Sequence, residues 1–141
     1  MLSICGAGAW LAVLVCGQEP QAQDGAQISR YTYAALAHVP EKARARRNPF
    51  ENRSEAVAAG RKLFALRCAE CHGEDGRGSR RGPSLRARVV RQASDGELFW
   101  IVSNGVVRRG MPEWSRLPEA QRWQIVTFLK SLDAADFSWA L

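Results

Sequence analysis

The sequence predicts an all-α fold of three to five helices joined by loops. Three segments, near residues 54–67, 94–104 and 118–132, repeat apolar residues at the three- and four-residue spacing of an amphipathic helix. No segment alternates apolar and polar residues over the length of a strand, and no internal repeat is visible. The 141 residues, 46% of them apolar, suit one domain with appendages and a core of its own.

The ends of the expected helices carry recognisable signals. Ser54 is the expected N-cap of the first helix. Ser94 and Glu97 have the spacing of a capping box at the start of the second, and Gly105 follows its last turn. The third helix is expected to begin at Pro118, because proline is favoured at the first helical position. Between the first two helices, the Gly-, Ser-, Pro- and Arg-rich stretch 73–91 is expected to be loop.

The chain divides by composition into five parts. Residues 1–16 are apolar and are expected to be an export signal or an anchor, since about 20 residues are needed for a transmembrane helix. Residues 17–27 form a polar, flexible linker, and residues 28–53 are expected to be an extended arm packed on the domain. The domain itself is expected at 54–132, followed by a C-terminal tail at 133–141.

Two features of these appendages leave alternatives open. Cys16 stands where a bacterial lipoprotein would be cleaved and lipidated, and a core helix is a third interpretation of this segment. The basic run at 42–47 could contact nucleic acid, but no recognition motif accompanies it. We therefore interpret it as a solvated or partner-facing strip, and we expect no nucleic-acid partner.

The central motif is Cys68-Ala69-Glu70-Cys71-His72, a C-x-x-C-H signature of c-type haem attachment. On a helical turn, positions i, i+3 and i+4 share one face. Both thiols can then bond the two haem vinyl groups while His72 lies under the iron. The motif predicts one haem c, covalently bound through Cys68 and Cys71, with His72 as an iron ligand.

Three other uses of this motif fit less well. A closed zinc site needs four ligands, and His38 is the only other histidine in the chain. A thioredoxin-like redox pair is expected beside a βαβ pattern, which is missing from the sequence. A simple structural disulfide between Cys68 and Cys71 remains an alternative.

Met111 is the expected second iron ligand. It lies between Gly110, which lets the chain pass close to a flat ligand, and Pro112, which restricts the backbone. The alternatives are that Met111 fills a gap in the core, or that His38 is the ligand, although His38 lies in the outlying arm. With His72 and Met111 bound, iron keeps no open position, which favours electron transfer over catalysis, and methionine raises the reduction potential.

Over about residues 54–132, these motifs resemble the class I monohaem c-type cytochromes, especially small periplasmic members and the haem domains of oxidases and dehydrogenases. Gly82-Pro83-Ser84-Leu85 is similar to the family loop whose proline carbonyl holds the histidine ring, and Gly110-Met111-Pro112 to its distal loop. The resemblance implies a hydrogen bond from His72 to Pro83.

The resemblance also implies a wall around the haem and a crossing of the first and last helices. The wall would include Leu85, Trp100, Ile101 and Val106, with core packing as the alternative role for Trp100. The residues expected at the crossing are Gly60 and Phe64, facing Ile125 and Phe128.

Charge and motif together predict the function. The net charge is +6, and six arginines lie between residues 77 and 91, with Arg108 and Arg109 before Met111. Near a haem edge they would attract redox partners with an acidic docking face. We expect a non-enzymatic single-electron carrier, periplasmic or tethered to the membrane, in a respiratory chain. It would work as a monomer or as a subunit of a redox complex, between a donor and an acceptor such as a dehydrogenase or terminal oxidase. The alternative is a haem enzyme or a gas or redox sensor with displaceable Met111.

Overall fold

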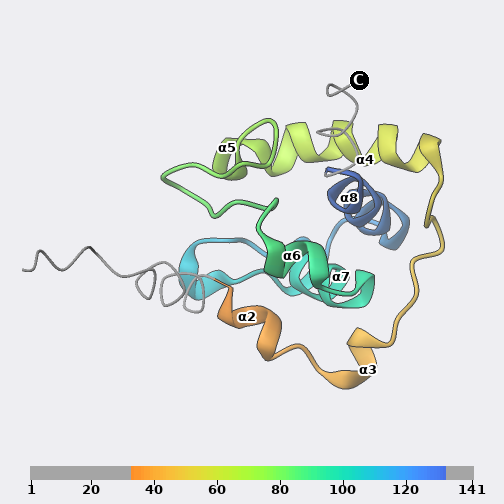
Figure 1. Ribbon diagram of the computed structural model, residues 1–141, viewed down its shortest axis with the longest axis horizontal. Helices are drawn as coiled ribbons and strands as arrows, with labels where there is room; N and C mark the ends of the chain where they lie inside the picture. The colour runs from red at the N-terminus through yellow and green to blue at the C-terminus, as the bar shows by residue number, and fades with distance from the viewer. Residues whose placement is uncertain (1–32, 133–141) are drawn as a thin grey trace, which may run out of the picture.

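The computed structural model describes residues 33–132, and within this range the regular elements are all helical (Figure 1). The predicted all-α fold is confirmed, although short helices bring the α-helices of residues 33–132 to seven, above the three to five predicted. The predicted export segment, the linker, the start of the arm and the C-terminal tail lie outside the described residues. In chain order the elements are α2 (Ala34–Ala37), α3 (Glu41–Arg44), α4 (Ser54–Arg67), α5 (Ala69–His72), α6 (Arg88–Gln92), α7 (Asp95–Asn104), the 3₁₀ turn η1 (Val107–Arg109) and α8 (Glu119–Ser131).

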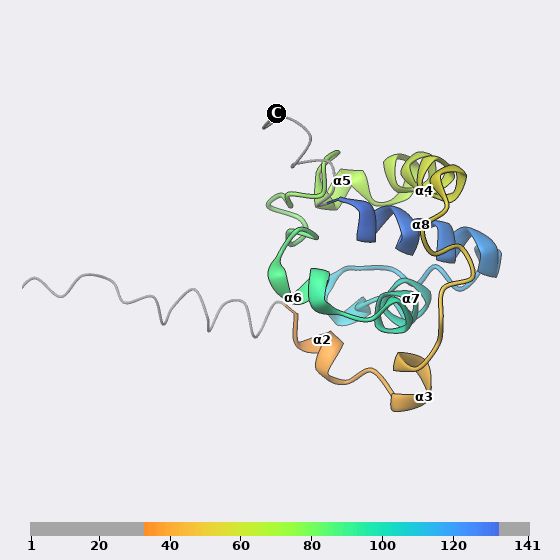
Figure 2. The ribbon, with the colours of Figure 1, turned by 45° about the vertical axis from the view of Figure 1, so that its right-hand side comes forward.

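Figures 1 and 2 show the helices in layers. Helices α4 and α5 form one side, α8 crosses beneath α4, α6 and α7 lie next, and α2 and α3 cover the far side. Within residues 33–132, no helix combines the length and the apolar character that crossing a bilayer would require.

The first and last long helices, α4 and α8, cross in close contact, as predicted. A Cβ atom at Gly60 would lie 1.9 Å from the backbone oxygen of Gln124, so only glycine permits this approach. Phe64 and Phe128 pack beside the crossing, with ring centroids 5.2 Å apart. Because α5 follows α4 directly, this crossing fixes the position of residues 68–72 relative to α8.

Helix α7 begins at the predicted capping box. The Ser94 hydroxyl accepts a hydrogen bond from the Glu97 backbone N–H at 3.1 Å, and the Glu97 carboxylate accepts one from the Ser94 N–H at 2.6 Å. Phe99 stacks on Trp123 of α8 with centroids 4.0 Å apart, in the centre of a second apolar cluster. Helix α7 is therefore fixed both at its start and along the face that meets α8.

The basic run of residues 42–47 is only in part the solvated or partner-facing strip that the sequence predicts, because Lys42 and Arg47 are exposed whereas Arg44 and Arg46 make contacts within the molecule. Arg44 donates to the carboxylate of Glu97 at 2.6 Å. The Arg46 guanidinium lies over the rings of Phe99 and Trp123, at 4.4 and 5.2 Å from their centroids. These two arginines dock the arm on α7 and α8.

Asn48 is the polar anchor of the arm. Its side chain is buried, and its amide donates to Asp95 at 2.9 Å and to the Thr127 hydroxyl at 3.0 Å. Its carbonyl oxygen accepts from the Phe50 backbone N–H at 2.9 Å. The described part of the arm, residues 33–53, thus packs on α7 and α8, and it contains two short helices, so it is not extended throughout as predicted.

Three local predictions differ from the structure. Arg53 occupies the N-cap position of α4 without a side-chain hydrogen bond, and Ser54 is the first helical residue. Pro118 is the N-cap of α8 and precedes its first turn. The stretch 73–91, expected to be loop, ends in the short helix α6, because Val90 packs into the apolar cluster around α7 and this burial outweighs the weak local helical signal.

Candidate functional site

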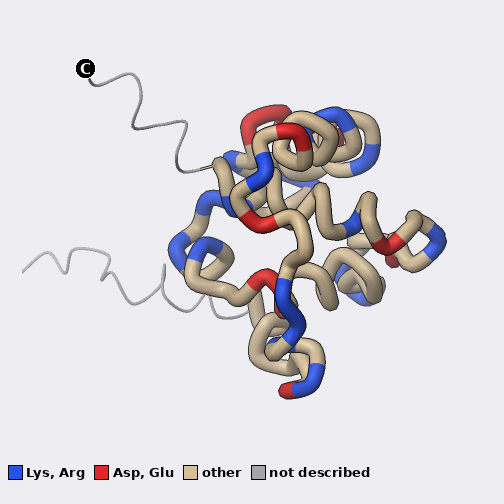
Figure 3. Tube along the Cα trace, turned by 90° about the vertical axis from the view of Figure 1, so that its right-hand side faces the viewer, with Lys and Arg blue, Asp and Glu red and all other residues tan. Residues whose placement is uncertain are grey.

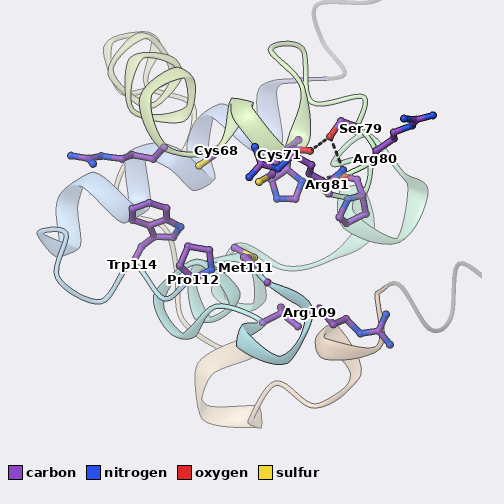
Figure 4. Close-up of a pocket in the computed structure, with 15 residues that line it drawn as sticks. Cys68, Cys71, Ser79, Arg80, Arg81, Arg109, Met111, Pro112 and Trp114 are labelled. Atoms are coloured by element: carbon purple, nitrogen blue, oxygen red, sulfur yellow. Dashed lines mark hydrogen bonds between the residues drawn. The ribbon is translucent and has the colours of Figure 1, made fainter.

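A cavity of about 410 Å³ opens between α5 and the loop that follows α7 (Figure 4). Cys68 and Cys71 line it from one side, and Met111 and Trp114 line it from the other (Figure 4). A smaller apolar cavity of about 100 Å³ shares six lining residues with the first. The two volumes therefore form one cleft, which is apolar in its depth.

The two thiols of the C-x-x-C-H motif both face this cleft. Cys68 lies at the break between α4 and α5, and Cys71 lies in α5. Neither thiol forms a disulfide. Burial, and then the neighbouring Cys71, raise the pKa of the Cys68 thiol to about 11, so Cys68 is a neutral thiol at neutral pH. A neutral thiol in an apolar cleft is suited to become a thioether, which carries no charge either.

The imidazole of His72 is held in one orientation. It is 8% exposed, and its Nδ1–H donates to the Pro83 carbonyl at 2.8 Å, as predicted. The backbone supports this geometry, because the Gly78 N–H donates to the His72 carbonyl at 2.8 Å and the Ser79 hydroxyl donates to the Cys71 carbonyl at 2.6 Å. With Nδ1 protonated, the lone pair of Nε2 is left for a metal ligand bond.

Met111 is fixed through its backbone. Its N–H and carbonyl pair with Val106 at 3.3 and 3.0 Å, which closes a tight loop around η1. Gly105 has φ +66°, and a Cβ there would lie 2.6 Å from the Met111 carbonyl oxygen, so the loop packs tightly on the end of α7. The methionine is presented from a closed, hydrogen-bonded turn.

Most of the predicted site residues meet in the cleft. Cys68, Cys71, His72, Pro83 and Met111 line its larger part. Among the residues predicted to form the wall, those that line its apolar depth are Leu85, Ile101 and Val106. His38 is exposed and lines neither part.

Trp100 is the predicted site residue that the structure does not bring to the cleft. Leu98, Ile101 and Val102 of α7 line the apolar depth, and these positions share one helical face. Trp100 lies two residues after Leu98, about 200° away around the helix, and is half-buried elsewhere.

Sequence reasoning missed two aromatic residues of the cleft. Trp114 lines both parts of the cleft. Its backbone N–H donates to the Val102 carbonyl of α7 at 3.1 Å. Tyr33 reaches the apolar depth from the arm. The position of Trp114 three residues after Met111 was the only available sequence signal, and Tyr33 had none.

Four arginines stand at the larger, more polar part of the cleft. They are Arg67, Arg80, Arg81 and Arg109. Arg81 also pairs with Glu70, and the Arg67 guanidinium lies 6.0 Å from the Trp114 ring centroid. Of the eight arginines predicted around the cleft, three line it, and Arg67 was not among those eight.

The residues present fit a haem c. The cleft offers two free thiols three residues apart, an imidazole with its Nε2 lone pair available, a thioether on the other side and an apolar interior. In residues 33–132, every buried side-chain nitrogen and oxygen has a hydrogen-bond partner. No group of three or more His, Cys, Asp or Glu side chains in this range could hold a metal ion, so a closed zinc site has no ligands here.

The helical fold and this cleft are those of a class I monohaem c-type cytochrome. Residues 55–129 match the model of the family described as cytochrome c oxidase, cbb3-type, subunit III, and the chain belongs to this family. It is also similar to the crystal structure of cytochrome cL from the marine methylotrophic bacterium Methylophaga aminisulfidivorans MPT, at 28% identity and a TM-score of 0.52. That similarity covers 59% of this chain and 57% of the cytochrome cL chain. No curated protein matches the chain significantly.

Proposed function

We propose that this chain carries one haem c, attached through Cys68 and Cys71 with His72 and Met111 as axial ligands, and that it transfers single electrons. The supporting observation is that all four side chains line one apolar cleft, with the thiols and Met111 on facing sides (Figure 4). When bound, the haem supplies a one-electron iron couple. We also propose that the haem-binding domain spans residues 54–132.

The residues of the chain would keep the two oxidation states of the iron similar in geometry. The Pro83 carbonyl orients His72, and the paired backbone of Val106 and Met111 holds the thioether in place. The apolar side chains in the depth of the cleft exclude water. A site that barely rearranges suits fast electron exchange, and low polarity together with a methionine ligand favours a high potential.

A haem enzyme or gas sensor would need an open iron position. The closed turn from Val106 to Met111 opposes this alternative, because its two backbone hydrogen bonds hold the residue at the cleft and moving its backbone away would break them. The described residues of the cleft also offer no acid–base pair beside Met111. We therefore favour outer-sphere electron transfer.

We also propose where the protein works and with what. The family description names a terminal oxidase, so we propose such an oxidase as the electron acceptor or as the complex that the chain joins. The arginines at the cleft would favour a partner with an acidic docking face. The apolar segment 1–16, outside the described residues, would export or anchor the chain, and we propose that the protein works in the periplasm or another extracytoplasmic space.

The test is to produce the protein in a host that matures c-type cytochromes and to record visible spectra of both oxidation states. We expect one covalent haem per chain, two thioether bonds, a methionine-to-iron band in the oxidised form and little carbon monoxide binding in the reduced form. Cys68→Ser and Cys71→Ser should each lose one thioether bond, and the matched exposed substitution Ser115→Ala should lose none. A colourless protein with both thiols free would overturn the proposal, and tight carbon monoxide binding by the unaltered protein would favour a sensor or an enzyme.

A further inference from the structure

The arm forms part of the cleft as well as packing behind it. Tyr33, Ala35 and Leu36 line the apolar depth, opposite residues of α4 and α8. All three precede residue 55, where the match to the family begins. The arm therefore adds a wall to the cleft from outside the segment that defines the family.

Tyr33 reaches the loop that holds the histidine. Its hydroxyl donates to the Ser84 carbonyl at 2.7 Å, across 51 residues of sequence. The preceding carbonyl, that of Pro83, accepts the hydrogen bond from His72 at 2.8 Å. Two successive carbonyls are thus fixed from different sides, one by the arm and one by the imidazole. A shift of the backbone at Pro83 and Ser84 would therefore move both contacts together.

Hydrogen bonds hold the arm in place, so that Tyr33 can restrain the backbone at Ser84. Arg44 donates to the Leu36 carbonyl at 3.3 Å and to the Val39 carbonyl at 3.2 Å, while its other nitrogen bonds Glu97. This arginine therefore ties the turn after α2 to the start of α7. With Asn48 anchored at the other end of the arm, Tyr33 and Leu36 are held at the cleft by contacts on both sides.

We infer that the arm completes the haem pocket, with Tyr33 as a positioning residue for His72 and Leu36 as a barrier to water; this inference rests on the proposed function. Tyr33 acts through Ser84 and Pro83, so losing its hydroxyl loosens the hydrogen bond at His72 Nδ1. Leu36 acts by excluding water from the apolar depth of the cleft. A polar residue at this position draws water toward the iron, which stabilises the more highly charged oxidised state and lowers the potential.

The experiment uses the haem-loaded protein and the variants Tyr33→Phe and Leu36→Ser. Nuclear magnetic resonance follows solvent exchange of the His72 Nδ1 proton, and redox titration gives the midpoint potential. In Tyr33→Phe we expect this proton to exchange about tenfold faster, the ratio that about 1.4 kcal/mol produces. In Leu36→Ser we expect a lower potential with the methionine-to-iron band retained. The matched control is Ala37→Ser, exposed on the same short helix, which should change neither quantity.

The outcomes separate this inference from the proposed function. If the unaltered protein contained no haem when produced in a host that matures c-type cytochromes, the proposed function would be refuted. Haem-loaded protein in which Tyr33→Phe leaves the exchange rate unchanged, and Leu36→Ser leaves the potential unchanged, would refute the inference and leave the function intact. Equal effects in Ala37→Ser and in the two test variants would also refute it, because they would show general loosening of the arm.

Discussion

At the scale of single residues, the two proposed iron ligands are held by different means. His72 is oriented through its side chain, by the Pro83 carbonyl at 2.8 Å, whereas Met111 is held through its own backbone. The thioether has no second polar group to fix it, so its position depends on the closed turn that begins at Val106. A substitution that keeps the backbone and removes only the sulfur can therefore isolate the role of the ligand.

Met111→Leu is such a substitution, because leucine has a similar volume and an exchange of this kind usually costs less than about 1.5 kcal/mol. We expect a folded protein without the methionine-to-iron band. Its reduced form should bind carbon monoxide, and its potential should fall by on the order of 0.1 V, part of the roughly 0.8 V range that axial ligands set. Val107→Met in the same loop, at a side chain that is 68% exposed, is the control and should keep the band. An intact band in Met111→Leu would contradict ligation by this residue.

Tyr33 should make stability depend on pH in the alkaline range. Burial raises the pKa of its phenol above the ordinary value of 10.0, and only the neutral phenol can donate to Ser84. Because the folded pKa is the higher one, the contribution is fully present below about pH 10 and is lost as pH rises through the folded pKa. Urea unfolding should show Tyr33→Phe less stable by about 1 kcal/mol at pH 7. The difference should shrink above pH 10, and a constant difference up to pH 11 would contradict this.

The chemistry of the site could be predicted from local sequence, while two aromatic residues of its walls could not. Cys68, Cys71 and His72 are fixed relative to one another by one helical turn, and Met111 carries its own Gly and Pro signals. Trp114 and Tyr33 reach the cleft only through tertiary contacts, with α7 and with Ser84 respectively. Such contacts join distant positions and leave no periodic pattern in the sequence.

At the scale of elements, the α4–α8 crossing depends on one missing side chain. Gly60→Ala would place a Cβ atom 1.9 Å from the Gln124 carbonyl oxygen and 2.9 Å from the Phe128 Cβ. The obstructing atom is backbone, so the helices must separate. We expect a loss of about 2 kcal/mol in the free energy of unfolding, after about 1 kcal/mol of gained helix propensity is set against about 3 kcal/mol of overpacking.

Urea unfolding of the haem-loaded protein measures this, and the exposed Ala58 on the same helix provides the control. Ala58→Gly changes helix propensity alone and should cost about 1 kcal/mol. If Gly60→Ala were as stable as the unaltered protein, or more stable, the close crossing would be refuted.

The docking of the arm should depend on Asn48 more than on its charged neighbours. Asn48→Ala removes three hydrogen bonds from a buried position, among them those to Asp95 and Thr127. We expect a loss of about 2 kcal/mol in urea unfolding, together with faster proteolysis within the arm. Arg47→Ala, at the exposed position next to it, should change stability by less than about 0.5 kcal/mol. Equal losses in the two variants would contradict a specific anchor.

The long helices were predictable because their signals are local, whereas the short ones were not. The capping box at Ser94 and the apolar stripe of α8 are written in neighbouring residues. Helices of four or five residues, such as α3 and α6, lack the length to be stable alone and form where packing supports them. The contacts of Arg46 within the basic run at 42–47 were not predictable for a similar reason, since the rings under its guanidinium belong to α7 and α8.

At the scale of the whole molecule, the 20 lysine and arginine residues overstate the positive charge that a partner meets, because 14 acidic residues offset part of it. Basic positions are spread over the fold with acidic positions between them (Figure 3). Arg44 and Arg46 pair with Glu97 and Glu119, and Arg122 bonds the Ser103 hydroxyl at 2.5 Å while lying over Phe99. Near the cleft, the field felt by an approaching partner should come mainly from the arginines that line it.

Small charged oxidants can test this field without a known partner. Oxidation of the reduced protein by anionic hexacyanoferrate(III) should slow by about tenfold between 10 mM and 0.5 M salt, and oxidation by cationic hexaammineruthenium(III) should accelerate, because salt screens the arginines at the cleft. Arg80→Gln with Arg109→Gln should flatten both dependences. Arg47→Gln with Arg88→Gln removes the same charge from exposed positions that do not line the cleft and should leave them steep. Equal slopes in the two double variants would show that net charge, and not the cleft arginines, steers the reagents.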